Sequence, residues 1–134
     1  MYGLLDVSAS GMIAQRTRLQ IATANLVNRG TLENARGEYD PYRRREAVIA
    51  AGDPDRNSPF GVHVHRVMKN DGPLRLRHEP NHPHANKDGY VGYPDIDVGT
   101  EMVNALDASR AYQANVQAAE STKSMVSMAL RLLA

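Results

Sequence analysis

The stretch DASRAYQANVQAAESTKSM, residues 107–125, contains no proline and no glycine and is rich in alanine and serine. Because proline and glycine disfavour a helix interior most strongly, this composition predicts an uninterrupted helix. The helical pattern continues on both sides, over residues 98–134, which corresponds to a rod about 55 Å long at ~1.5 Å per residue. Asp97 is expected to cap the first turn of this helix.

Small and apolar residues recur along this helix in two series, each with a period of seven residues. A seven-residue repeat keeps one stripe of side chains facing a partner helix. The helix is therefore expected to pack against another helix along its length. The predicted stripe consists of Val98, Met102, Ala105, Ser109, Tyr112, Val116, Ala119, Val126, Leu130 and Leu133.

The N-terminal segment, residues 1–33, carries the same repeat. Leu5, Met12, Leu19 and Leu26 follow one another at steps of seven residues. Gly30 is expected to end this helix, because glycine tolerates the left-handed conformation that often follows a last turn. The two helical ends are predicted to pair with each other, and several turns of the longer helix are then left over.

Residues 34–95 differ from both ends, because all seven prolines and all five histidines of the chain lie among them. The stretches VHVHRV (62–67) and PLRLR (73–77) alternate apolar and polar side chains, as half-buried strands do. The sequence therefore predicts an α+β chain. Segments 1–33 and 96–134 would form one helical core domain, and residues 34–95 a small β-rich insert built from an antiparallel sheet or mainly from loops.

The composition excludes several classes of protein. Lys and Arg number 16 and Asp and Glu 15, for a net charge of +1, whereas general nucleic-acid or membrane-surface binders usually have a clear basic excess. Cysteine is absent, which rules out disulfides, thiolate metal sites and thiol catalysis. No apolar run is long enough to span a membrane. The N-terminal residues lack the basic leader and apolar stretch of a signal peptide, which taken alone favours a cytosolic protein.

The histidines of the insert are the first candidates for a chemical site. His63 and His65 lie on one face of a predicted strand and could both reach a metal ion. However, no acidic residue is held at ligand spacing, and Asp53 and Asp95 lie beside Gly or Pro, where Asp commonly forms turns or caps. We therefore predict no catalytic residue, no metal site and no cofactor. A metal-dependent hydrolase that uses the histidines is the alternative.

Two further features concern partners. The run Arg43, Arg44, Arg45 favours a solvated strand edge, where charge blocks unwanted strand pairing. Along residues 98–134, alanine, serine and apolar residues occupy most faces, which is typical of a helix enclosed in something larger. The small insert cannot enclose this helix, so its cover is expected to come from other subunits. The alternative is a soluble coiled-coil adaptor with a single partner.

Both ends of the chain resemble the axial proteins of the bacterial flagellum, the rod and hook family. Residues 10–31, SGMIAQRTRLQIATANLVNRGT, are similar to the N-terminal signature of this family in the pair AQ (14–15) and the run ANLVN (24–28). Residues 89–130, which include GYV, EMV and SRAYQAN, resemble the members that form the proximal rod. The short insert also favours these members over distal-rod and hook proteins. A FlgB-like rod protein is the alternative within the family.

The resemblance implies a structural subunit of the proximal rod, without enzymatic activity, that polymerises through its terminal helices and helps to transmit motor torque. It implies that these helices pair as an antiparallel coiled coil, with the heptad stripes, Asn25 and Asn28 as assembly residues. The implied partners are copies of the chain, rod proteins of the FlgB, FlgF and FliE types, and the type III export apparatus. The implied location is the periplasmic rod of the basal body, reached without a cleaved signal peptide.

Overall fold

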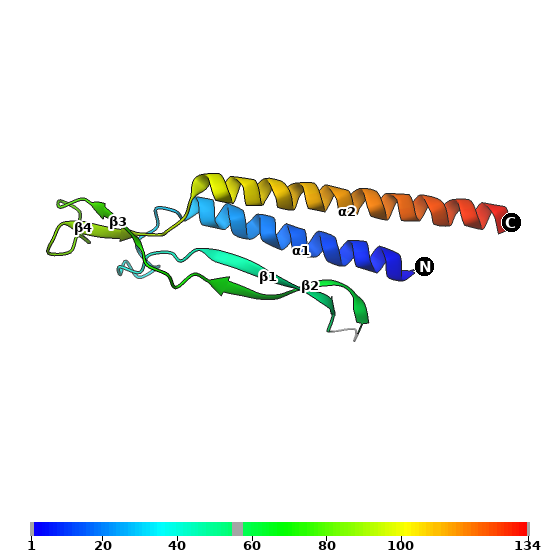
Figure 1. Ribbon diagram of the computed structural model, residues 1–134, viewed down its shortest axis with the longest axis horizontal. Helices are drawn as coiled ribbons and strands as arrows, with labels where there is room; N and C mark the ends of the chain where they lie inside the picture. The colour runs from blue at the N-terminus through cyan, green and yellow to red at the C-terminus, as the bar shows by residue number, and fades with distance from the viewer. Residues whose placement is uncertain (1, 55–57, 134) are drawn as a thin grey trace.

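The computed structural model describes residues 2–54 and 58–133, with only the backbone described for Tyr2 and Leu133. Two helices frame four strands, so the predicted α+β class is confirmed (Figure 1). The strands form two separate two-stranded antiparallel sheets. In chain order the elements are α1 (Tyr2–Val27), β1 (Arg45–Asp53), β2 (Ser58–Lys69), β3 (Arg75–His78), β4 (Tyr90–Tyr93) and α2 (Val98–Leu133).

The long helix α2 begins where the sequence predicts. The Asp97 carboxylate accepts hydrogen bonds from the backbone N–H and the hydroxyl of Thr100, both at 2.8 Å. The hydrogen bond from the backbone N–H of Thr100 lowers the pKa of Asp97 below its ordinary value, and the hydrogen bond from the Thr100 hydroxyl lowers it further. The predicted N-cap is therefore confirmed, and it satisfies backbone groups that the first turn of a helix otherwise leaves unpaired.

Helices α1 and α2 lie side by side and antiparallel, with both chain termini at the same end of the molecule (Figure 1). Two contacts define their register. The side chains of Asn25 and Glu101 are hydrogen-bonded at 3.0 Å, and a Cβ added to Gly11 would lie 2.7 Å from the Asn115 side chain. Between these contacts both helices advance by the same length, two heptads. Because a heptad repeat returns to the same face of a helix, the same two faces meet again after that interval.

The β1–β2 hairpin packs against the other side of α1, so that α1 lies between the hairpin and α2 (Figure 1). Near the start of α1, the Ser10 hydroxyl accepts a hydrogen bond from the backbone N–H of Val62 at 3.2 Å. Gly61 adopts a positive φ of 87° beside this contact, and a Cβ added there would lie 2.7 Å from the Ser10 hydroxyl. A glycine is needed at this position because both the conformation and the space exclude a side chain.

The second sheet, β3–β4, lies at the opposite end of the molecule from the two termini (Figure 1). The loop that follows α1 packs against this sheet, and the Tyr39 hydroxyl donates to the carbonyl of Gly92 at 2.8 Å. Val91 and Ile96 are buried near this point. The connection between α1 and β1 is thereby fixed to the segment that leads into α2.

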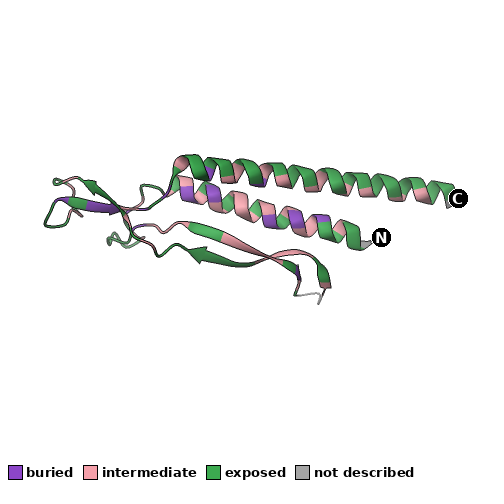
Figure 2. Ribbon diagram, viewed as in Figure 1, coloured by how far each residue is buried: buried purple, intermediate pink, exposed green. Residues whose placement is uncertain are grey.

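The core is small, and its residues are mostly small as well. The buried apolar residues of the described chain are Ala14, Ala22, Leu32, Val91, Ile96 and Ala108. Figure 2 shows that buried positions follow α1 and the region around β4, whereas most of α2 is exposed. Within the described ranges, neither helix combines the length and apolar character needed to cross a membrane.

The close approach of α1 and α2 at Gly11 gives a first prediction. Gly11→Leu should force the helices apart and lower the free energy of unfolding by about 1–3 kcal/mol, the usual cost of overpacking. Gly3→Leu is the matched control, because a Cβ added to Gly3 meets nothing within 4 Å. The control should be neutral or slightly stabilising, since leucine favours a helix more than glycine does. Urea unfolding of both variants measures the difference, and equal stabilities would contradict the close approach.

Candidate assembly site

Four polar side chains and the backbone of Arg45 meet where the end of α1, the start of β1 and the first turn of α2 come together. We call this cluster the polar junction; its side chains are those of Asn25, Tyr42, Arg44 and Glu101. Asn25 is completely buried, and Glu101 is 1% exposed. Buried polar groups of this kind are costly unless all their hydrogen bonds are made.

Asn25 uses all of its hydrogen-bonding capacity. Its amide nitrogen donates to the backbone carbonyl of Arg45 at 2.8 Å and to the Glu101 carboxylate at 3.0 Å. Its amide oxygen accepts from the backbone N–H of Arg45 at 2.9 Å and from the Tyr42 hydroxyl at 3.1 Å. A side-chain amide offers two donor and two acceptor positions, so none is left unsatisfied. Asn25 thus pairs with the edge of β1 as a neighbouring strand would.

Glu101 connects the same point to α2. One of its carboxylate oxygens accepts the Asn25 amide, and the other accepts the Arg44 guanidinium at 2.7 Å. Glu101 also lies in the first turn of α2, where the helix dipole favours a negative charge. Burial lowers the pKa of Arg44, but its hydrogen bond to Glu101 and the charges of Glu101 and Glu46 outweigh burial and hold the pKa above its ordinary value. Burial also raises the pKa of Tyr42.

The sequence analysis missed most of this junction. The prediction of a solvated edge for the arginine run is wrong for Arg44, which pairs with Glu101, and Arg43 donates to the carbonyl of Gly72 at 2.6 Å. Arg45 is exposed as predicted and stacks over the Tyr42 ring at 5.3 Å. The heptad pattern gave no signal for Glu101, because Glu101 lies outside both seven-residue series of this helix.

The structure places the predicted α1 stripe at the margin of the helix contact. Leu5, Met12, Leu19 and Leu26 are all partly exposed. Two contacts with α2 lie one residue earlier, at Gly11 and Asn25. Asn28 closes the end of α1, where its side chain donates to the carbonyl of Ala24 at 2.9 Å and accepts from the Thr31 hydroxyl at 3.1 Å.

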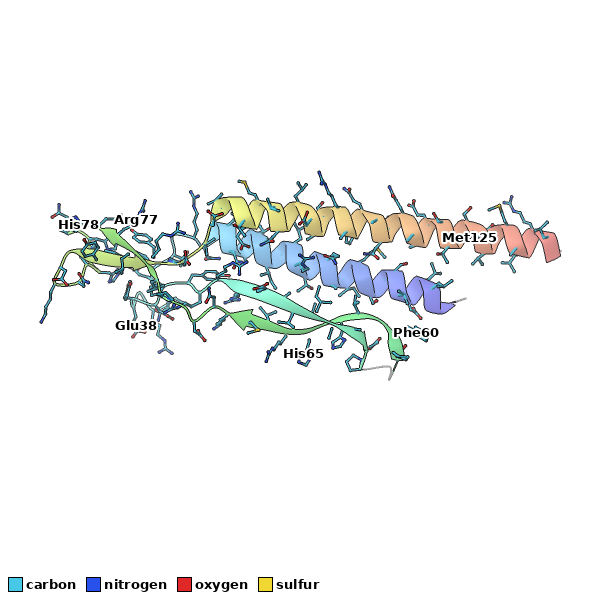
Figure 3. The ribbon with its side chains drawn as sticks, viewed as in Figure 1. Glu38, Phe60, His65, Arg77, His78 and Met125 are labelled. Carbon is cyan, nitrogen blue, oxygen red and sulfur yellow. The ribbon has the colours of Figure 1, made fainter. Side chains whose placement is uncertain are left out.

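In the single chain, some residues of the predicted α2 stripe are exposed and the others are partly covered. Met102, Tyr112 and Leu130 are 59%, 39% and 62% exposed, respectively, and the side chain of Leu133 lies outside the described residues. The other members are partly covered: Val98, Ala105, Ser109, Val116, Ala119 and Val126. In Figure 3, Met125 and the hairpin residue Phe60 lie at the end of the molecule that carries the termini. Much apolar surface of α2 thus remains in water, which in soluble proteins indicates an interaction site.

The histidines take part in local contacts. A ring nitrogen of His63 lies 2.8 Å from the carbonyl of Gly52, and one of His84 lies 2.7 Å from the Glu33 carboxylate. His65 extends from the hairpin on the side away from α1 (Figure 3). Across residues 2–54 and 58–133, no three His, Asp or Glu side chains gather closely enough to hold a metal ion. His63 and His84 thus each link two separate segments of the chain.

Known proteins are similar to this chain in sequence, both in α2 and over nearly its whole length. Residues 87–132, which include Glu101, match the family model described as flagellar basal body rod FlgEFG protein C-terminal. The chain is 36% identical to the flagellar basal-body rod protein FlgC of Salmonella typhimurium over 132 residues, which cover 98% of this chain and 97% of the relative. It is 34% identical to FlgC of Bacillus subtilis over 142 residues, covering 96% and 95%. The chain belongs to the FlgC family of flagellar basal-body rod proteins.

The chain is also 33% identical to FlgC of Borreliella burgdorferi over 150 residues, covering 99% of this chain and 97% of the relative. The resemblance to rod and hook proteins drawn from the two ends of the sequence is confirmed. The chain is accordingly a structural rod protein of the flagellar basal body. The apolar surface left open on α2 agrees with a protein that functions in an assembly.

The polar junction yields a second prediction. Asn25→Asp removes the two donated hydrogen bonds and sets a second carboxylate beside Glu101, so stability at pH 7 should fall by about 2–4 kcal/mol. Burial and Glu101 would raise the pKa of the new carboxyl in the folded state. Its protonated form is therefore tolerated at low pH, and the loss of stability should grow as the pH rises from about 4 to 7.

Asn81→Asp, at an exposed position, makes the same change in net charge and is the control. Chemical unfolding of the two variants between pH 4 and pH 7 makes the comparison. If Asn25→Asp and Asn81→Asp had the same stability at every pH, Asn25 would not be a buried part of the junction.

Proposed function

We propose that this chain is a subunit of the proximal rod that polymerises through α1 and α2 and helps to transmit motor torque. The observation that carries the proposal is that the single chain covers few of the α2 side chains and leaves many apolar ones exposed. Among the described side chains of this helix, only Glu101 and Ala108 are buried. Seven large apolar residues of α2 are at least half exposed: Met102, Val103, Leu106, Met125, Met128, Leu130 and Leu132. A helix with apolar residues on several faces needs cover from other chains.

The proposal includes an antiparallel coiled coil of α1 and α2. Its support is the equal advance of two heptads in both helices between the Gly11–Asn115 and Asn25–Glu101 contacts. In this arrangement segments 1–33 and 96–134 act as one helical core domain and residues 34–95 as an insert, of which the β1–β2 hairpin lies along α1. The heptad residues of both helices, with Asn25 and Asn28, would be the assembly residues.

Torque transmission requires that the two helices do not slide past each other. A shift of one residue would break the hydrogen bonds of Asn25 and leave buried donors and acceptors unpaired, at about 1–3 kcal/mol for each such group. The salt bridge between the partly exposed Arg44 and the buried Glu101 adds to this resistance, because separating the pair would leave the buried charge of Glu101 uncompensated. The polar junction is thus suited to a subunit that works under mechanical load.

The partners and location proposed for the chain follow from its family. Rod proteins of the FlgB, FlgF and FliE types are the proposed neighbours, and the periplasmic part of the basal body is the proposed site. Export through the type III apparatus, without removal of a signal peptide, would bring the chain there. We also propose that the chain has no enzymatic activity, as suits a family of structural rod proteins. A soluble adaptor with one partner is disfavoured, because its apolar α2 faces would stay in water.

Tyr112 provides the test of this function. Tyr112 is 39% exposed in the single chain, so Tyr112→Ala should lower the stability of the free chain by less than the ~3–5 kcal/mol that loss of a fully buried ring costs. If neighbours bury the ring in the rod, its loss costs up to about 3–5 kcal/mol in every copy. In a strain that lacks the native gene, the variant should therefore be absent from isolated basal bodies, and motility should be lost.

Gln113→Ala, at the adjacent exposed position, is the matched control and should restore motility. Swimming assays and immunoblots of basal bodies measure the two variants. Full motility with Tyr112→Ala would mean that no neighbour covers this face of α2.

A further inference from the structure

Two methionines lie on one exposed face near the C-terminal end of α2. Met125 and Met128 are 58% and 55% exposed. Their spacing, i and i+3, places both side chains on the same side of the helix. Leu132, which is 88% exposed, continues this side by one further turn. Both thioether side chains are therefore open to solvent in the free chain.

The register of the helices explains why α1 does not cover these two methionines. Continued from the contact between Gly11 and Asn115, the register brings Tyr2 opposite Ser124. Both methionines thus lie beyond the described part of α1, and Met125 is seen at the end of the molecule that carries the termini (Figure 3). The β1–β2 hairpin lies on the far side of α1 from α2, so it covers neither methionine (Figure 1).

The other described methionines have different surroundings. Met12 is partly buried in α1, next to the close approach of the two helices at Gly11. Met68 and Met102 are 45% and 59% exposed, but Met68 belongs to β2 and Met102 directly follows Glu101 of the polar junction. Among the described methionines, the pair near the end of α2 is therefore the one that shares a single helix face.

The thioether group of methionine reacts with peroxides. The sulfur donates an electron pair to one peroxide oxygen and forms an S–O bond, the O–O bond breaks, and the second oxygen leaves as water after proton transfer. The sulfur is oxidised, the peroxide is reduced, and the product is methionine sulfoxide. A flexible apolar side chain thereby becomes polar, which disrupts contacts that depend on methionine.

We propose that Met125 and Met128 form an oxidation site that regulates the assembly of this chain. A peroxide oxidises both residues in the free chain, and the two sulfoxides make this face of α2 polar. The oxidised chain then no longer packs against a neighbour and is left out of the rod. This inference rests on the proposed function, in which neighbouring chains cover α2, and it holds whichever neighbour makes the contact.

Oxidation of the purified chain with hydrogen peroxide tests the site itself. Peptide mass spectrometry over time should show that Met125 and Met128 each gain one oxygen atom well before Met12 does, because Met12 is partly buried. Equal rates at the three residues, or faster oxidation of Met12, would overturn the proposal.

Two double variants test the effect on assembly in a strain that lacks the native gene. Met125→Gln with Met128→Gln makes the face polar at similar side-chain length, as oxidation does. Met125→Leu with Met128→Leu keeps the face apolar, cannot form a sulfoxide, and is the matched control. The Gln variant should be missing from isolated basal bodies, whereas the Leu variant should be recovered at the level of the native chain.

Chemical unfolding of the purified variants separates this effect from misfolding. Both variants should be as stable as the native chain, since neither position belongs to the core. A Gln variant less stable than the Leu variant would mean that the two side chains are packed in the free chain, which contradicts an open site.

The basal-body results distinguish failure of this inference from failure of the proposed function. Recovery of the Gln variant at the level of the Leu variant would overturn the regulation and leave the rod function standing. Loss of both variants while the native chain is present would mean that the methionine side chain itself is required, which also overturns the proposal. If the native chain is missing from basal bodies, the proposed function itself fails.

Discussion

The hydrogen bonds of Asn25 hold the three parts of this protein in one arrangement. A single buried side chain pairs with the backbone of Arg45 at the edge of β1, with the Tyr42 hydroxyl, and with Glu101 in the first turn of α2. Buried polar contacts often add little net stability, but a displaced partner is costly. Their effect here is to select one register of α1 against α2 and one position of the hairpin.

The location of this junction decides where the surplus length of α2 appears. Glu101 fixes the start of α2 beside the end of α1, so the additional length of the 36-residue α2, compared with the 26-residue α1, projects at the opposite end. The core between the helices is built from small residues such as Ala14, Ala22 and Ala108. Small residues allow close helix packing but bury little apolar area. Much apolar surface of the single chain is therefore still available for packing against neighbours.

The parts of the structure that depend on local sequence could be predicted. The helix at the C-terminus, its Asp97 cap, the α+β class and the family all followed from periodicity, caps and motifs. The junction could not be predicted in this way, because Asn25 and Glu101 are far apart in sequence and heptad patterns give apolar residues the closest positions. Met12 and Leu26 of the predicted α1 stripe are each preceded by a residue, Gly11 and Asn25 respectively, that contacts α2 in the single chain. The packing of the hairpin on α1 depends on Gly61 and Ser10, which no local pattern connects.

Amide hydrogen exchange along α2 in the free chain tests the central claim most directly. If the polar junction holds the start of α2 in place and its C-terminal end has no packing partner in the free chain, amide protection should be strongest from Glu101 to Asn115. It should then decline towards Leu132. Residues 125–132 should exchange almost as fast as an isolated helix, since they have no partner in α1. Uniform protection along α2, or stronger protection at its C-terminal end, would contradict the claim that the junction anchors this helix.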